Sequence, residues 1–131
     1  MKIDLQAPDF PAFWASQVNS GDVDAVVALY NEKATLLPTF SPKVVKDRTG
    51  LINYFTGLAS KEGAGVELQD DTVVCLPAGQ HGYVTSGMYA FRFKVDGSLQ
   101  TFPSRFTFVI DLAEDSPILH HHSSLVPTAP D

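Results

Sequence analysis

The sequence predicts an α+β fold in which N-terminal helices pack on a strongly curved antiparallel sheet and enclose an internal pocket. Apolar residues recur at helical spacing up to about residue 59, and long strand-like segments, separated by Gly and Pro, follow beyond Gly63. Helices first and strands afterwards are typical of α+β domains. The chain has 131 residues, 44% of them hydrophobic, so we expect one domain over residues 1–131 with an ordered core at about 8–127.

Two helices are expected first, each with one apolar stripe. Asp9 is expected to cap the first helix and Gly21 to end it, and its stripe is formed by Phe10, Phe13, Trp14, Gln17 and Val18. Asp22 is expected to open the second helix, and that stripe is formed by Val23, Val26, Val27 and Tyr30. Both helices therefore need an apolar surface to cover.

A short strand at residues 34–37 is expected next, stopped by Pro38 and followed by a polar loop over residues 39–47. A third helix is expected from Thr49 or Gly50 to about residue 59. Its apolar stripe includes Tyr54, so this phenol is expected on the buried side of the helix.

Four longer strands are expected at residues 66–76, 83–95, 98–112 and 118–126, joined by short loops into an antiparallel meander. Asp96-Gly97 predicts a two-residue hairpin, because both central residues of a type I′ turn need positive φ. Strands of this length twist and coil. Gly87 and Pro103 are expected to be the bulges or bends that curl the sheet into a cone.

Composition excludes several classes of partner. The formal net charge is −6 and the nine Lys and Arg residues are scattered, so we expect no nucleic-acid and no membrane partner. No segment approaches the roughly 18 apolar residues of a membrane span, and the first residues do not resemble a signal peptide, so a cytoplasmic location is expected. The single cysteine cannot form an internal disulfide.

The string His120-His121-His122-Ser123-Ser124 is the most informative motif. Strict alternation along a strand places Ile118, His120, His122 and Ser124 on one face, so the three imidazoles cannot meet at one ion. His120 and His122 would supply two zinc ligands, but no convincing third ligand is found, and we expect no metal and no cofactor. Two other interpretations stay open: an affinity-tag remnant, and imidazoles and hydroxyls that satisfy one another at a sheet edge or dimer interface.

A functional interpretation makes this strand the wall of a reactive pocket. We expect His122 and Ser124 to bind and deprotonate a small polar substrate, because imidazole exchanges protons near neutral pH and a hydroxyl both donates and accepts. Tyr54 and Thr39 are expected to complete the set. Arg105, within an apolar strand, is expected either to pair with Asp111 or Asp70 or to await an anionic ligand.

Several segments together resemble the iota-class carbonic anhydrase family. They are Ala28-Leu29-Tyr30, Thr35-Leu36-Leu37-Pro38-Thr39, Tyr54-Phe55, Gly87-Met88-Tyr89-Ala90-Phe91, Arg105-Phe106-Thr107-Phe108-Val109 and the His-Ser string. That family has the nuclear-transport-factor-2-like (cystatin-like) cone and is related to the association domain of calcium/calmodulin-dependent kinase II.

This resemblance implies that the chain hydrates carbon dioxide in a small pocket that works without metal. Carried over by position, the catalytic residues are Thr39, Tyr54, His122 and Ser124. The residues expected to bind substrate are Arg105, His120 and Ser123.

Two alternatives to carbonic anhydrase activity remain. One is a polyketide cyclase-like or ketosteroid isomerase-like enzyme, which would need a large apolar cavity and a carboxylate base. The other is a non-catalytic oligomerisation or ligand-binding module. The expected partners are a small molecule such as carbon dioxide or bicarbonate, and a second copy of the chain in a homodimer or larger homo-oligomer.

Overall fold

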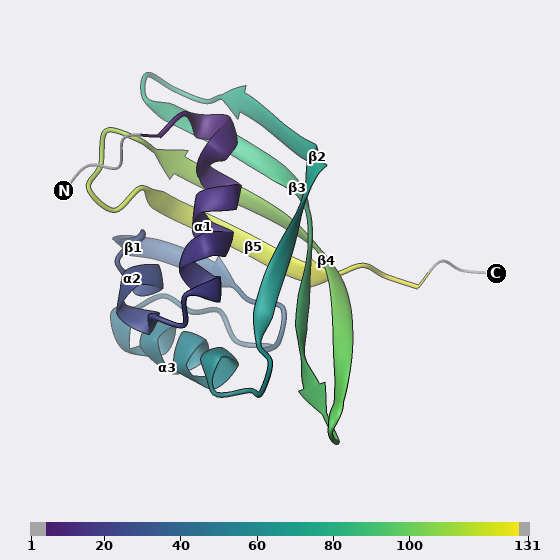
Figure 1. Cartoon of the computed structure of the whole chain (residues 1–131). Coiled ribbons are helices and arrows are strands. Elements are labelled where there is room, and N and C mark those ends of the chain that lie inside the picture. Colours follow the sequence, from purple (N-terminus) through teal and green to yellow (C-terminus); the bar gives the residue numbers. More distant parts are fainter. Residues whose placement is uncertain (1–4, 129–131) are drawn as a thin grey trace.

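A computed structural model describes residues 5–128 of the chain (Figure 1). Helical elements precede the long strands, as the sequence predicts. The order is η1 (Ala7–Asp9), α1 (Phe10–Asn19), α2 (Val23–Val27), β1 (Tyr30–Leu37), α3 (Arg48–Ala59), β2 (Gly65–Pro77), β3 (Gly82–Val95), β4 (Ser98–Asp111) and β5 (Ile118–Leu125).

Aspartates cap two of the helices. The Asp22 carboxylate accepts a hydrogen bond from the Ala25 N–H at the start of α2, and the Asp47 carboxylate accepts from the Gly50 N–H at the start of α3. The expected cap at Asp9 is wrong, because its side chain makes no capping hydrogen bond and the 3₁₀ turn η1 leads directly into α1.

The second helix is shorter than expected. Tyr30 was expected on its apolar stripe, but α2 ends at Val27 and Tyr30 begins β1, which runs to Leu37 and so starts four residues earlier than the predicted strand. The cause is a long-range pairing, since Tyr30 lies opposite Ile118 of β5. A pattern local to residues 22–30 contains no information about that partner.

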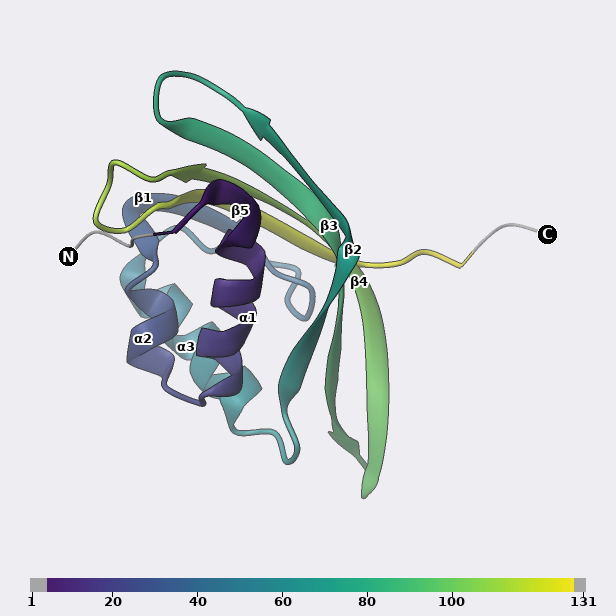
Figure 2. The same cartoon turned by 45° about the horizontal axis from the view of Figure 1, so that its top comes forward.

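The sheet has five strands in the order β1-β5-β4-β3-β2. The expected antiparallel meander from β2 to β5 is confirmed, and the Asp96-Gly97 turn has the expected positive φ values of 52° and 81°. Parallel pairing of β1 with β5 makes the sheet mixed instead of purely antiparallel. The sheet is curled but not closed (Figure 2).

The bulges of the sheet do not lie where the sequence predicts them, and a bend at Gly87 or Pro103 stays a prediction. β3 and β4 pair without a register shift from Gly82 to Val95, so Gly87 and Pro103 are not bulges. Register shifts occur instead in β2 between Gln69 and Val74, and between β4 and β5 at Val109/Ile110. Gly87 is needed for space, because a Cβ there would lie 3.1 Å from the Phe106 ring.

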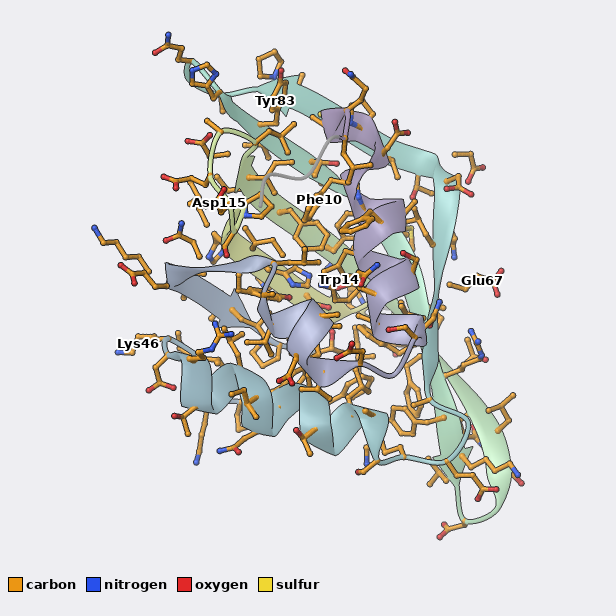
Figure 3. The ribbon with its side chains drawn as sticks, turned by 60° about the vertical axis from the view of Figure 1, so that its left-hand side comes forward. Phe10, Trp14, Lys46, Glu67, Tyr83 and Asp115 are labelled. Atoms are coloured by element: carbon orange, nitrogen blue, oxygen red, sulfur yellow. The ribbon has the colours of Figure 1, made fainter. Side chains whose placement is uncertain are left out.

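The helices cover one face of the sheet, here called the inner face, and in the described chain no helix covers the opposite, outer face (Figures 1 and 2). Phe10 and Trp14 of α1 point onto the inner face (Figure 3), where their rings pack against Phe108 and Tyr89 of the sheet. None of the helices in residues 5–128 is long and apolar enough to cross a membrane. The cytoplasmic location stays a prediction.

Candidate functional site

A bulge near the start of β5 decides which residues of the His-Ser string face the core. Val109 pairs with His120 but Ile110 pairs with Ile118, so one extra residue, Leu119, stands in β5. Ile118 is therefore on the same inner face as His121. Strict alternation correctly grouped His120, His122 and Ser124 on one face, but it wrongly added Ile118 to them.

The inner face receives His121 and Ser123, which are 1% and 4% exposed. The outer face receives His120, His122 and Ser124. The four expected catalytic residues thus do not converge: Thr39 and Tyr54 lie on the helix side of the sheet, whereas His122 and Ser124 line a depression on its outer face.

His121 is the centre of a buried polar group. Its Nδ1 lies 2.8 Å from the Tyr30 hydroxyl and its Nε2 lies 3.0 Å from the Tyr89 hydroxyl. The ring of Phe108 stacks on the imidazole with 4.0 Å between ring centroids, and Trp14 packs against its edge. Both nitrogens of a water-excluded imidazole are therefore hydrogen-bonded, as burial requires.

Hydrogen bonds extend this group in both directions. At one end, Trp14 Nε1 donates to the Tyr30 hydroxyl over 3.1 Å. At the other, the Tyr89 hydroxyl donates to Ser123 Oγ over 2.6 Å, and Ser123 Oγ lies 2.5 Å from Thr39 Oγ1. We call this chain the inner cluster, composed of Trp14, Tyr30, His121, Tyr89, Ser123 and Thr39.

Balancing donors against acceptors gives the inner cluster a direction. Trp14 can only donate, so the Tyr30 oxygen accepts and its own hydrogen goes to His121 Nδ1. The neutral imidazole then carries its proton on Nε2 and donates to Tyr89. In turn Tyr89 donates to Ser123 and Ser123 donates to Thr39. The hydroxyl hydrogen of Thr39 is left over, so the cluster ends in a donor.

Burial keeps the inner cluster uncharged. Desolvation, with smaller effects of His120 and His122, lowers the pKa of His121 well below its usual value. Desolvation likewise raises the pKa of Tyr30 and of Tyr89 far above that of a free phenol. At neutral pH, the imidazole and both phenols are neutral.

Tyr54 lies close to this cluster but in its own cavity. Desolvation raises the pKa of its phenol to about 12, an effect partly offset by a hydrogen bond with the backbone of Phe40, the residue after Thr39. Tyr54 and Phe40 both line a cavity of 240 Å³. The loop after β1 thus brings together two of the expected residues, Thr39 and Tyr54.

Arg105 does not have the buried ion pair considered from the sequence. Its side chain is exposed on the outer face, and within residues 5–128 its guanidinium has no carboxylate partner. The carboxylate of Asp111 instead accepts from the Ala113 N–H. Arg105 lies opposite Ser124 in the sheet, and both line the outer depression together with His122.

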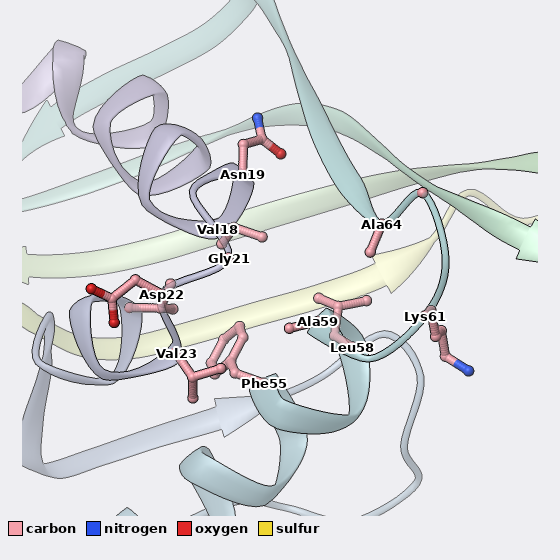
Figure 4. A pocket seen from close by; sticks show the side chains of 12 residues that line it. Val18, Asn19, Gly21, Asp22, Val23, Phe55, Leu58, Ala59, Lys61 and Ala64 are labelled. Atoms are coloured by element: carbon pink, nitrogen blue, oxygen red, sulfur yellow. The ribbon is translucent and has the colours of Figure 1, made fainter.

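A further cavity of 270 Å³ lies between α1, α2, α3 and the start of β2 (Figure 4). Two of its polar side chains already have structural partners: Asn19 forms two hydrogen bonds with the backbone of Val66, and Asp22 caps α2. The remaining wall is mostly apolar, including Phe55 and Leu58. This cavity offers room but no free acid or base from those two residues.

In the described part of the chain, no three His, Cys, Asp or Glu side chains are grouped to hold a metal ion. His120 and His122 lie on the outer face, and the expectation of no metal and no cofactor stays a prediction. Sequence reasoning missed the roles of Tyr30, Tyr89 and His121. A signal was present, because a buried tyrosine generally needs a partner for its hydroxyl.

Comparison with known proteins places these observations in a family. The profile of the SnoaL-like domain matches residues 10–129. No curated protein sequence matches the chain.

Similar solved structures share the fold across nearly the whole chain. A candidate calcium/calmodulin-dependent protein kinase II association domain from Xanthomonas campestris is 25% identical, with a TM-score of 0.81, over 98% of this chain and 96% of that one. An NTF2-like protein with a cystatin-like fold from Novosphingobium aromaticivorans has a TM-score of 0.73 at 13% identity, covering 93% and 80%. The epoxide hydrolase/cyclase-like enzyme SalBIII has a TM-score of 0.73 at 17% identity, covering 90% and 88%.

Proposed function

The chain belongs to the SnoaL-like domain family, and from this premise we propose that it is an enzyme that performs proton-transfer chemistry on a small molecule at the inner cluster, with carbon dioxide as the substrate. The observation that carries this proposal is the unbroken hydrogen-bond chain from Trp14 through His121 to Thr39. The catalytic roles expected for His122 and Ser124 are assigned to their inner neighbours His121 and Ser123.

The available base favours this reaction over isomerase-type chemistry. Ketosteroid isomerase-like catalysis uses a carboxylate held in an apolar site. No Asp or Glu is among the buried side chains of the described residues. An imidazole kept neutral by burial is the group able to accept a proton here.

Cavity size also favours a small substrate. The cavities beside Tyr54 and between the helices measure 240 and 270 Å³. A third, of 590 Å³, borders Tyr30 but is lined mainly by polar and charged side chains. Pockets for drug-sized ligands are roughly 300–1,000 Å³. The long apolar cavity that a cyclase substrate would need is not among these spaces on the helix side.

In the proposed reaction, a water molecule bonded to Thr39 attacks carbon dioxide and yields bicarbonate and one proton. This path needs the other tautomer of His121, in which Nδ1–H donates to the Tyr30 oxygen and the Tyr30 hydroxyl hydrogen gives up its acceptor. The donors from Thr39 to Tyr89 then reverse, and Thr39 can pass the proton through Ser123 and Tyr89 to Nε2. Because burial disfavours the imidazolium, the proton then returns through Tyr89 and Ser123 to half-buried Thr39, where it is released to water. The Tyr54 hydroxyl, which keeps its proton at neutral pH, donates to the forming bicarbonate.

Stopped-flow measurement of carbon dioxide hydration tests this proposal. Relative to wild type, Ser123→Ala and Thr39→Val should each lower the catalysed rate by about 10²-fold or more, because each interrupts the proton path. Thr101→Val is the matched control, since Thr101 is an exposed hydroxyl residue of β4 outside the cluster, and it should leave the rate unchanged. An inactive wild type, or a loss confined to Ser124→Ala, would contradict the proposal.

Self-association is a second candidate function, favoured by the similarity to the Xanthomonas association domain and by the uncovered outer face. Val74 and Leu76 of β2 are 55% and 61% exposed, and each pairs with a β3 residue that points to the outer face. We infer a homodimer that buries this apolar part of the face. Light scattering should show twice the monomer mass for wild type and the monomer mass for Leu76→Glu, and a ring of ten or more subunits would favour an assembly module over an enzyme.

A further inference from the structure

We propose that the outer face of the sheet carries a second site, which binds a small oxyanion between Arg105, His122 and neighbouring hydroxyls. This outer depression has a volume of 550 Å³, and its polar lining is formed by Thr72, Ser86, Arg105, Thr107, His122 and Ser124. The proposal does not depend on the function proposed for the inner cluster, because the two groups of side chains lie on opposite faces of the sheet.

Sheet register brings the polar side chains of the depression together. Arg105 is paired with Ser124 and Thr107 is paired with His122 across β4 and β5, and Ser86 of β3 is paired with Thr107. Side chains of directly paired residues lie on one face with Cβ atoms about 4.5–5.5 Å apart. A guanidinium, an imidazole and three hydroxyls thus occupy one patch, with the guanidinium diagonal to the imidazole.

Most of these polar groups have unused hydrogen-bonding capacity. In the part of the chain that the structure describes, the side chains of Ser86, Thr107 and Ser124 make no hydrogen bond, and Arg105 makes no ion pair. Thr72 differs, because its hydroxyl donates to the Gln69 carbonyl and accepts from the Met88 N–H. It is a structural part of the bulge in β2, whereas the others are free for a ligand.

Charge in the depression is opposite to that of the whole chain. The chain has 15 Asp and Glu residues against nine Lys and Arg, yet no carboxylate lines the outer depression. A guanidinium presents five donors in a planar fork that matches two oxygens of a carboxylate or phosphate. The ligand that fits is therefore a small oxyanion, with hydroxyls bonding its remaining oxygens.

Inorganic phosphate and acetate are the probes, and two-dimensional NMR titration of the full chain is the measurement. Both anions should shift the backbone amide signals of residues 105, 107, 122 and 124 in a saturable way, with those of the inner cluster less affected. Tighter binding of phosphate would indicate a phosphorylated ligand, and tighter binding of acetate a carboxylate.

Arginine variants make the test specific. Arg105→Gln should weaken binding by at least about tenfold, and Arg105→Lys by less, because it keeps the charge but loses the fork. Arg48→Gln is the matched control, since it removes the same charge from the exposed start of α3 and should leave binding unchanged. Equal weakening by Arg48→Gln and Arg105→Gln would overturn the proposal, as would shifts centred on the cavity between the helices.

The Arg105→Gln variant also distinguishes an oxyanion site from an interface between copies of the chain. If Arg105→Gln converts a dimer to a monomer in light scattering while neither anion shifts residues 105–124, the patch is an interface between copies and not an oxyanion site. If Arg105→Gln loses anion binding but keeps its oligomeric mass, the oxyanion site is supported.

Discussion

β5 presents one His-Ser pair to each face of the sheet, and the two pairs differ in nearly every physical respect. His121 and Ser123 are buried, and their side chains are bonded to Tyr30, Tyr89 and Thr39. His122 is exposed and Ser124 half-buried, and neither side chain has a hydrogen-bond partner within residues 5–128. Identical residue types in adjacent positions thus become a neutral internal chain on one face and a set of open donors on the other. Strand register, and not residue chemistry, decides their roles.

Matched leucine substitutions give the largest expected contrast between the two faces. His121→Leu leaves the Tyr30 hydroxyl without its acceptor and the Tyr89 hydroxyl without its donor in a water-excluded site. At about 1–3 kcal/mol for each orphaned group, unfolding in urea should show a loss of about 2–5 kcal/mol. His122→Leu should change the free energy of unfolding by less than about 0.5 kcal/mol, because that side chain is exposed. Equal effects of the two variants would mean that the faces are assigned incorrectly.

The pH dependence of stability gives the next largest effect. The pKa of His121 in the folded chain lies below its unfolded value of about 6.5, so the unfolded chain binds the proton first on acidification. Its contribution is therefore present in full above pH 6.5 and is lost as the pH falls below it, by at most about 1.4 kcal/mol per pH unit. Urea unfolding between pH 7.5 and 5 should show this slope in wild type and a smaller one in His121→Gln. Parallel slopes would show that His121 titrates alike in both states.

Local signals predicted much of the fold. The Asp96-Gly97 hairpin, the start of α2 at Asp22 and the order of β2 to β5 follow from turn chemistry, capping and alternation, which all act within a few residues. The cap at Asp47 was not predicted.

The features that the sequence did not predict depend on pairing between distant strands. Tyr30 is in a strand because of its partner in β5, and Leu119 is an extra residue only with respect to β4. Both features affect the candidate site, because Tyr30 belongs to the inner cluster and Leu119 lies next to the His-Ser string. The inward-facing pair of β5 is His121 and Ser123 and not the expected His122 and Ser124, while Thr39, at the strand end, does lie beside a serine of β5.

Deleting the extra residue of the bulge gives the smallest expected effect, and a matched insertion makes it a sharp test of the comparison. Deleting Leu119 leaves Ile118 inward, His120 outward and His121 inward by simple alternation, so the inner cluster should persist and the free energy of unfolding should change by less than about 1 kcal/mol. Inserting one Ala between His121 and His122 is the matched contrast, because it moves the imidazole of His122 into the place of Ser123 and should cost more than about 2 kcal/mol. Urea unfolding measures both, and the NMR signals of Tyr30 and Tyr89 report on the cluster. A tolerated insertion, or a deletion that unfolds the chain, would show that something other than register holds the two pairs on their faces.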